Sequence, residues 1–178
     1  MARTLTEVLA QIEAPGSFAT RLHASAEELD LAIAGLGPLE FPITEEAAMT
    51  REIISTPDAP GSASYGSFPY SQAVRAAGLV FVSGQGPFDP VTGAIVGSTI
   101  GEQTAQCMRN IEAILRAAGS SLAQAVNATF ILRHPEDFAG MNEEWVRWFP
   151  TDPPARQGAR HPLDVEGMRI SIAVVAEA

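Results

Sequence analysis

The sequence predicts an α+β fold in which two helices pack on one face of a mostly antiparallel sheet. Three observations indicate this class. Residues 101–118 place their apolar side chains on one side of a helix, and residues 135–149 repeat the pattern. Short apolar runs bounded by turn residues precede, separate and follow these two segments, as strands do. Elements in this order are expected to form one layer of sheet and one layer of helices.

The first 48 residues differ from the rest and are expected to form an extension outside the main domain. Residues 4–14 carry apolar side chains at helical spacing, and residues 29–44 alternate around glycines and a proline. Few of these side chains suit chemistry. We therefore predict a helix plus a hairpin in residues 1–48, without an assigned role, followed by one domain over residues 49–178.

The domain begins with β structure. Residues 51–56 form the first expected strand, and residues 57–72 are rich enough in Gly, Pro and Ser to form an irregular loop. The apolar run from Leu79 to Val82, a turn from Pro87 to Gly93 and a further short strand predict antiparallel pairing.

The helix predicted over 101–118 is followed by Gly119, a suitable C-cap. Its buried face is expected to contain Thr104, Cys107, Met108, Ile111, Ile114, Leu115 and Ala118. A strand over 126–133 precedes the second helix, whose apolar stripe consists of Phe138, Met141, Trp145, Trp148 and Phe149. Strands over 156–160 and 168–176 complete the sheet. Because so short a chain has little left to cover the second sheet face, self-association is expected.

Composition limits the possible functions. The chain has 178 residues, of which 46% are hydrophobic and 18% are charged, as in ordinary globular proteins. Its apolar runs fall short of the roughly 20 residues of a membrane span, and its N-terminal stretch contains too many polar residues for a secretory signal. A cytoplasmic protein is expected, with no membrane partner. The net charge of −10 argues against a nucleic-acid partner, whose phosphates require Lys and Arg.

The residues that bind metals are few and scattered. Cys107 is the single cysteine, and His23, His134 and His161 lack the spacing that places ligands on one face. The sequence therefore predicts no metal site and no cofactor.

Arg156 follows Pro153 and Pro154 at the start of an expected strand. Its guanidinium group is always charged and offers a planar fork of donors that suits a carboxylate. Two interpretations remain open: Arg156 anchors an anionic small molecule, or it forms a salt bridge with a neighbouring side chain.

Five motifs follow one another along the domain: "PYSQAV" at 69–74, "VFVSGQGPFDPVTGAIV" at 80–96, "EQTAQCMRNIEAILRAAGSSLAQAV" at 102–126, "DFAGMNEEW" at 137–145 and "PPAR" at 153–156. In this order they resemble the reactive intermediate deaminase family, RidA or YjgF, over about residues 51–176. The resemblance implies a chorismate-mutase-like α+β subunit that assembles as a homotrimer with clefts between subunits. It also implies hydrolysis of imines and enamines of 2-amino acids to 2-keto acids and ammonia, so the expected partner is a small carboxylate-bearing imine, enamine or keto acid.

The resemblance also implies roles for individual residues. Arg156 would bind the substrate carboxylate, and the backbone N–H of Gly158 would contact the same anion. The remaining pocket positions, contributed by different subunits, match Tyr70, Ser83, Gly84 and Asn142. Each has a structural alternative: a solvated hydroxyl for Tyr70, a tight bend for Gly84, and a loop brace for Asn142.

The chain departs from the family pattern where the final strand would carry a catalytic glutamate, because Ser171 occupies that position. A carboxylate can accept a proton near neutral pH, whereas an unactivated hydroxyl can orient a water but not act as its base. The loop between Asn142 and Arg156 is also about three residues shorter than the family pattern and is crowded by prolines. Glu166, in the preceding turn, is an alternative source of a carboxylate.

Three functions remain open on this evidence. The chain is a 2-imino acid hydrolase with Ser171 in a modified pocket, a non-catalytic trimeric binder of a small carboxylate metabolite, or a branch of the family acting on another nitrogen compound. A ribonuclease, which has also been described in the family, is disfavoured by the acidic charge and by the lack of a basic strip interleaved with aromatic residues.

Overall fold

The computed structural model describes residues 51–62, 69–161, 163 and 165–178. The expected helix plus hairpin of residues 1–48, and the domain boundary at residue 49, lie outside the described residues and stay predictions.

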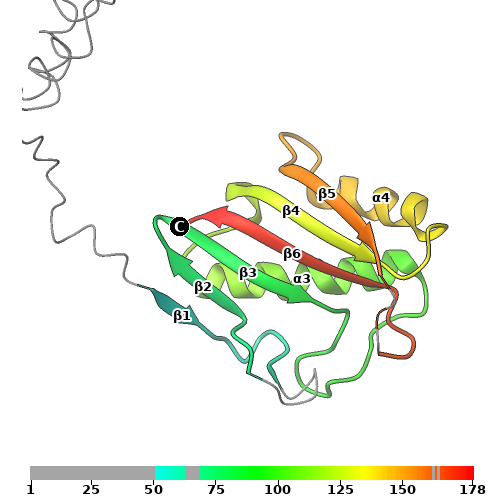
Figure 1. Ribbon diagram of the computed structural model, residues 1–178, viewed down its shortest axis with the longest axis horizontal. Helices are drawn as coiled ribbons and strands as arrows, with labels where there is room; N and C mark the ends of the chain where they lie inside the picture. The colour runs from blue at the N-terminus through cyan, green and yellow to red at the C-terminus, as the bar shows by residue number, and fades with distance from the viewer. Residues whose placement is uncertain (1–50, 63–68, 162, 164) are drawn as a thin grey trace, which may run out of the picture. The chain divides into compact units, whose positions relative to one another are not determined.

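The described chain contains a six-stranded sheet with strand order β1-β2-β3-β6-β4-β5 (Figure 1). Its strands are β1 (Glu52–Ile54), β2 (Ala73–Ala76), β3 (Leu79–Gln85), β4 (Ala125–Leu132), β5 (Ala155–Arg160) and β6 (Ile170–Glu177). Neighbouring strands are antiparallel except β4 and β5, which run parallel. The expectation of a mostly antiparallel sheet is confirmed.

Two helices, α3 (Ile100–Ala117) and α4 (Asp137–Trp148), lie behind the sheet in Figure 1. The start of α3 is fixed by a capping box, in which the Thr99 side chain accepts from the Glu102 N–H and Glu102 accepts from the Thr99 N–H. Gly119, with φ of 75°, follows its end, as predicted. A short 3-10 helix, η4 (Leu122–Gln124), leads into β4.

The alternation of side chains along the strands shows which sheet face the helices cover. On β6 the buried side chains are Ile170, Ile172, Val174 and Ala176. The residues between them point to the opposite face, which the helices leave open. There Phe81 is 44% exposed and Ile53 is 61% exposed. The prediction that both helices pack on one face is confirmed, and the open face is apolar.

Buried polar side chains of α3 hold the loops at one end of the sheet. Asn110 Nδ2 donates to Gly86 O at 3.1 Å and to Phe88 O at 3.0 Å, and Gln103 Nε2 donates to Gly167 O at 2.8 Å. These contacts fix the turn after β3 and the loop before β6. The expected short strand after this turn is wrong, because only a single bridge forms between Phe88 and Ile95.

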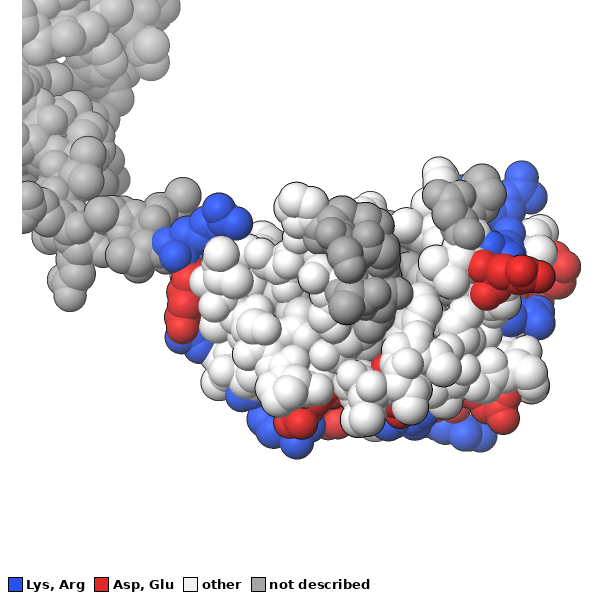
Figure 2. Space-filling model, turned by 90° about the horizontal axis from the view of Figure 1, so that it is seen from below, with Lys and Arg blue, Asp and Glu red and all other residues white. Residues whose placement is uncertain are grey.

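Seen from below, charged side chains of the domain gather along its lower edge and at its ends, while the surface between them is largely uncharged (Figure 2). Within the residues that the structure describes, no helix is long and apolar enough to cross a membrane.

Candidate functional site

Arg156 lies on the helix-covered side of β5, against two aromatic rings. The parallel register places Arg156 beside buried Ala128 of β4, so both side chains point toward the helix layer. The guanidinium carbon of Arg156 lies 5.3 Å from the centroid of the Phe130 ring and 5.0 Å from that of Trp145. Cation–π contacts engage the faces of a guanidinium, so its in-plane N–H donors stay available for a carboxylate.

The salt-bridge interpretation of Arg156 finds no support in the structure. The three ion pairs of the described chain join Arg75 to Glu52, Arg147 to Glu144 and Arg169 to Asp137. Arg156 is exposed and pairs with no carboxylate in the described part of the chain. It is therefore placed as an unneutralised cation whose orientation is set by aromatic side chains.

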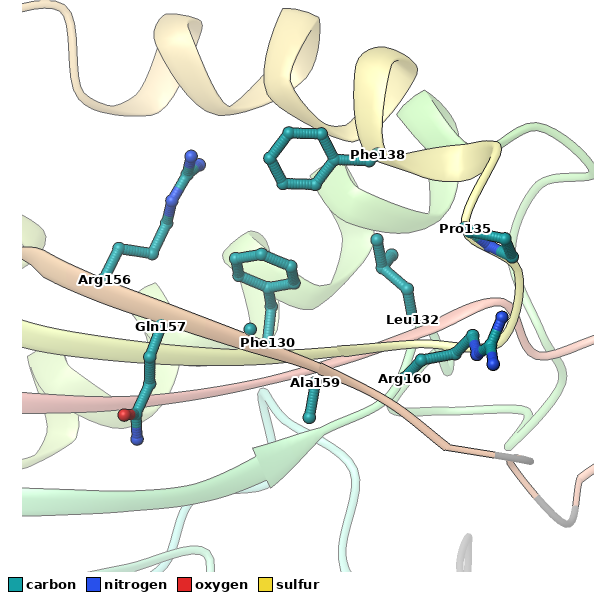
Figure 3. Close-up of a pocket in the computed structure, with 9 residues that line it drawn as sticks. Phe130, Leu132, Pro135, Phe138, Arg156, Gln157, Ala159 and Arg160 are labelled. Atoms are coloured by element: carbon teal, nitrogen blue, oxygen red, sulfur yellow. The ribbon is translucent and has the colours of Figure 1, made fainter.

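A groove of about 460 Å³ lies between β5 and the start of α4, with Arg156 in its wall (Figure 3). Its lining is Phe130, Leu132, Pro135, Phe138, Arg156, Gln157, Gly158, Ala159 and Arg160. Figure 3 shows Arg156 rising toward α4, while Gln157 and Ala159 point to the other side of the strand. Within the described residues, this lining contains two arginines and no acidic residue, which suits an anionic ligand with an apolar part.

Gly158 lies directly under the Phe130 ring. A Cβ atom on Gly158 would come within 2.2 Å of that ring, so only glycine lets Phe130 pack against the β5 backbone. The Phe130 ring is in turn one of the two that contact Arg156. Gly158 thus has a structural role that the sequence does not reveal, beside the predicted N–H contact to the anion.

Asn142 lies on α4, four residues after Phe138 and three before Trp145, so it shares their side of the helix. Phe138 lines the groove and Trp145 contacts Arg156, which places Asn142 on the helix side that borders the same region. Arg156, Gly158 and Asn142 therefore form one group.

The other four predicted residues gather around an irregularity in β3. The register between β3 and β6 shifts between Val82 and Gln85, and Ser83 and Gly84 lie in that interval. Ser83 Oγ donates to Ser71 O at 2.7 Å, and Gln85 Nε2 donates to the hydroxyl of Tyr70. These hydrogen bonds therefore hold Ser83 and Tyr70 near the end of β3, beside the register shift against β6.

Ser171 belongs to this second group. A Cβ atom on Gly84 would lie 3.0 Å from Ser171 Oγ, so the glycine leaves the serine hydroxyl uncovered. Ser171 pairs with Ile131 and lies between buried Ile170 and Ile172, so its side chain points to the open face of the sheet. Its hydroxyl forms no hydrogen bond with the described residues, and Glu166 is an exposed loop residue that pairs with none of them.

Arg156 and Ser171, one residue from each group, lie on opposite faces of the sheet. Arg156 points toward the helices, whereas Ser171 points away from them, with β4 and the sheet itself between the two side chains. One chain therefore does not bring Arg156 and Ser171 to the same small ligand. A site that contains both needs residues from a second copy.

Sequence reasoning missed the residues that shape the groove. Phe130 and Trp145 were expected only as core residues, and Arg160 was not singled out. The alternation of Arg156, Gly158 and Arg160 along one strand was a signal that both arginines share a side. Gln85 was also missed: it is fully buried, and its amide holds the Tyr70 hydroxyl. Across the described ranges, no group of three or more His, Cys, Asp or Glu side chains could hold a metal ion.

Comparisons with known proteins relate this arrangement to characterised relatives. Residues 61–178 match a family model described as Endoribonuclease L-PSP. The RutC family protein y4sK of Sinorhizobium fredii is 46% identical over 105 residues, which is 59% of this chain and 80% of that protein. The human protein named 2-iminobutanoate/2-iminopropanoate deaminase is 35% identical over 130 residues, covering 73% of this chain and 92% of that protein.

A solved structure supports the same fold. The crystal structure of E. coli TdcF with bound serine aligns with a TM-score of 0.64 at 30% identity, covering 71% of this chain and 98% of that chain. The family match begins after β1 and includes the other five strands and both helices.

Proposed function

Because the chain belongs to the RidA/YjgF family, we propose that it hydrolyses 2-imino and enamine acids to 2-keto acids and ammonia. The observation that carries this proposal is Arg156, whose guanidinium faces contact Phe130 and Trp145, whose donors border a groove, and which pairs with no carboxylate among the described residues. Two relatives support it: the human relative is named a 2-imino acid deaminase, and the TdcF structure contains serine, an amino acid with a carboxylate.

In this reaction the substrate carboxylate binds Arg156 through two parallel N–H donors. A water adds to the carbon of the C=N bond, and its proton moves to the nitrogen. The resulting carbinolamine expels ammonia and leaves a C=O bond at the same carbon. An enamine first takes a proton on its terminal carbon and becomes the imine. Holding the carboxylate and the water in place lowers the barrier by orientation.

The proposed active unit is a homotrimer with sites between neighbouring copies. One copy supplies Arg156, Gly158 and Asn142, and the next supplies the group around the β3 irregularity: Tyr70, Ser83, Gly84 and Ser171. The positions of Arg156 and Ser171 on opposite sheet faces support this division. The open apolar sheet face supports association, because exposed apolar patches of this kind mark interfaces.

Ser171 is proposed to replace the catalytic glutamate of the family. A hydroxyl can accept one hydrogen bond and donate another, which suffices to orient the attacking water. It does not accept the water's proton near neutral pH, so the reaction depends more on orientation and on the basicity of the imine nitrogen. A slower deaminase than one with a glutamate is expected.

The test is a coupled assay in which an amino-acid oxidase generates imines in situ and semicarbazide traps those that remain. Wild-type protein should reduce the trapped imine. Arg156→Ala should lower kcat/KM by about ten- to a hundredfold, because a charged hydrogen-bond pair contributes about 1.5–3 kcal/mol.

The control is Arg116→Gln, which removes the same charge from an exposed position on α3, outside the groove. It should behave as wild type. Equal trapping with wild type and Arg156→Ala across the panel would overturn the catalytic proposal.

A second candidate function is favoured by the serine at position 171. Without a carboxylate there, the chain would bind a small carboxylate metabolite and not convert it. Calorimetry with 2-keto acids separates the two candidates: Arg156-dependent binding without loss of imine in the coupled assay would identify a binding protein.

A further inference from the structure

The groove beside α4 contains a second arginine, at the opposite end from Arg156. Arg160 lies four residues later on β5 and pairs with Leu132, so alternation puts it on the same side of the strand as Arg156. Figure 3 shows Arg160 below Pro135, with Leu132 and Phe130 between the two arginines. The groove therefore has a cationic group at each end and an apolar floor between them.

Among the residues that the structure describes, this positive charge is local and unneutralised. The chain has 21 acidic and 11 basic residues, yet the described residues of the groove lining include two arginines and no acid. The ion pairs of the described chain involve neither arginine. A site with unpaired cations in a strongly acidic chain favours a ligand that supplies the missing negative charges.

We propose that Arg160 binds a second carboxylate of the substrate, so that the groove is specific for 2-imino dicarboxylic acids. The inference rests on the proposed function, in which Arg156 holds the carboxylate next to the imine. The amino acids that commonly supply such imines carry their anionic side-chain group as a carboxylate, which matches the fork of an arginine.

The spacing of the two arginines indicates the length of this substrate. A strand rises about 3.3 Å per residue, so the Cα atoms of Arg156 and Arg160 are about 13 Å apart. Each bidentate pair takes up about 4 Å between guanidinium and carboxylate carbons. Arg160 points away from Arg156 in Figure 3, so about 5 Å remains once its side chain turns to extend parallel to that of Arg156. Carbon–carbon bonds of about 1.5 Å in a zigzag span that distance in a dicarboxylate of about five carbons. Its middle carbons would lie over Phe130 and Leu132.

The experiment compares two imines of equal chain length, of which only one has a second carboxylate. Oxidases generate 2-iminoglutarate from glutamate and 2-iminopentanoate from norvaline, and semicarbazide reports the imine that remains. Wild type should have the higher kcat/KM for 2-iminoglutarate. Arg160→Gln should lower that value by about ten- to a hundredfold, through KM, and leave 2-iminopentanoate unchanged.

Arg116→Gln is the matched control, because it removes one positive charge at a distance from the groove lining. It should preserve the preference for 2-iminoglutarate. If Arg160→Gln affects both imines equally, or neither, the assignment of Arg160 is overturned.

Binding measurements separate this inference from the proposed function. Calorimetry with 2-oxoglutarate and 2-oxopentanoate uses stable keto acids and requires no turnover. If no imine is hydrolysed, the proposed function fails, but weaker binding of 2-oxoglutarate alone to Arg160→Gln still supports a dicarboxylate groove. Equal binding of 2-oxoglutarate and 2-oxopentanoate to wild type would overturn the assignment of a dicarboxylate groove.

Discussion

At the scale of single residues, the sequence predicts a role for Arg156 but does not predict its aromatic neighbours. The type of residue and its position after two prolines predicted an anchor for an anion. The aromatic rings beside it were not predicted, because their proximity depends on the register of β4 against β5 and on the path of α4. The sequence alone predicted the chemistry of Arg156. Its contact partners could not be predicted without the register of the strands in the folded chain.

Restoring a carboxylate at position 171 tests the role of the serine. Ser171→Glu should raise kcat in the coupled imine assay by about 10²- to 10⁴-fold, the usual contribution of a positioned general base. Ser171→Gln has nearly the same size and cannot act as a base, so it should not raise kcat. Similar rates for the two variants would show that a missing base is not what limits the reaction.

Even an alanine side chain at position 158 should lower the stability of the protein. In Gly158→Ala the new methyl group would clash with the Phe130 ring. The ring must then move, and Arg156 loses one of its two cation–π contacts. The free energy of unfolding should fall by about 1–3 kcal/mol, and KM for imino acids should rise.

Gly101→Ala is the control for this substitution, since a Cβ atom at Gly101 meets nothing within 4 Å. It should stabilise α3 slightly, by up to about 1 kcal/mol. Denaturant unfolding measures both changes, and unchanged stability in Gly158→Ala would contradict the packing described for Phe130.

At the scale of elements, α3 was predicted to within one residue at each end, because its apolar spacing and its following glycine are local signals. The strand expected after the turn at 87–93 was wrong for a reason that is not local. The carbonyl of Phe88 accepts hydrogen bonds from Gln106 and Asn110 of α3, which bind this backbone to the helix instead of to a strand. Buried polar side chains of α3, rather than local sequence, therefore explain why the expected strand does not form.

The capping box of α3 makes stability depend on pH. Hydrogen bonds from the backbone and side chain of Thr99, and from the Ser98 N–H, lower the pKa of Glu102 below its usual value of 4.5. A lowered folded-state pKa contributes stability that is present above the unfolded pKa and is lost as the pH falls through the folded pKa. Glu102→Gln should therefore have a lower unfolding midpoint than wild type at pH 7. The difference should shrink below about pH 4.5; a constant difference would contradict this account.

At the scale of the whole molecule, the predicted self-association and the split site support each other. The sequence indicated one uncovered sheet face, and the structure places Ser171 on that face and Arg156 on the other. The extension at 1–48 remains outside this reasoning. Its sequence contains few candidates for chemistry.

Mixing two defective variants tests the division between copies. Arg156→Ala lacks one half of the proposed site, and Gly84→Val crowds Ser171 in the other half. Each alone should be nearly inactive. Trimers formed by co-refolding equal amounts should regain about one quarter of wild-type activity, because a site is intact when each neighbour supplies its sound half. A mixture no more active than its parents would show that the halves do not combine across copies.

In the proposed trimer, placing Arg156 and Ser171 on opposite faces of one sheet would make catalysis depend on protein concentration. A dissociated chain would keep its fold, its arginine and its serine, yet never hold both against one ligand. Activity per chain would then decline on dilution, and a carboxylate ligand that touches two copies would favour their assembly by mass action. The substrate would therefore stabilise the oligomer that hydrolyses it.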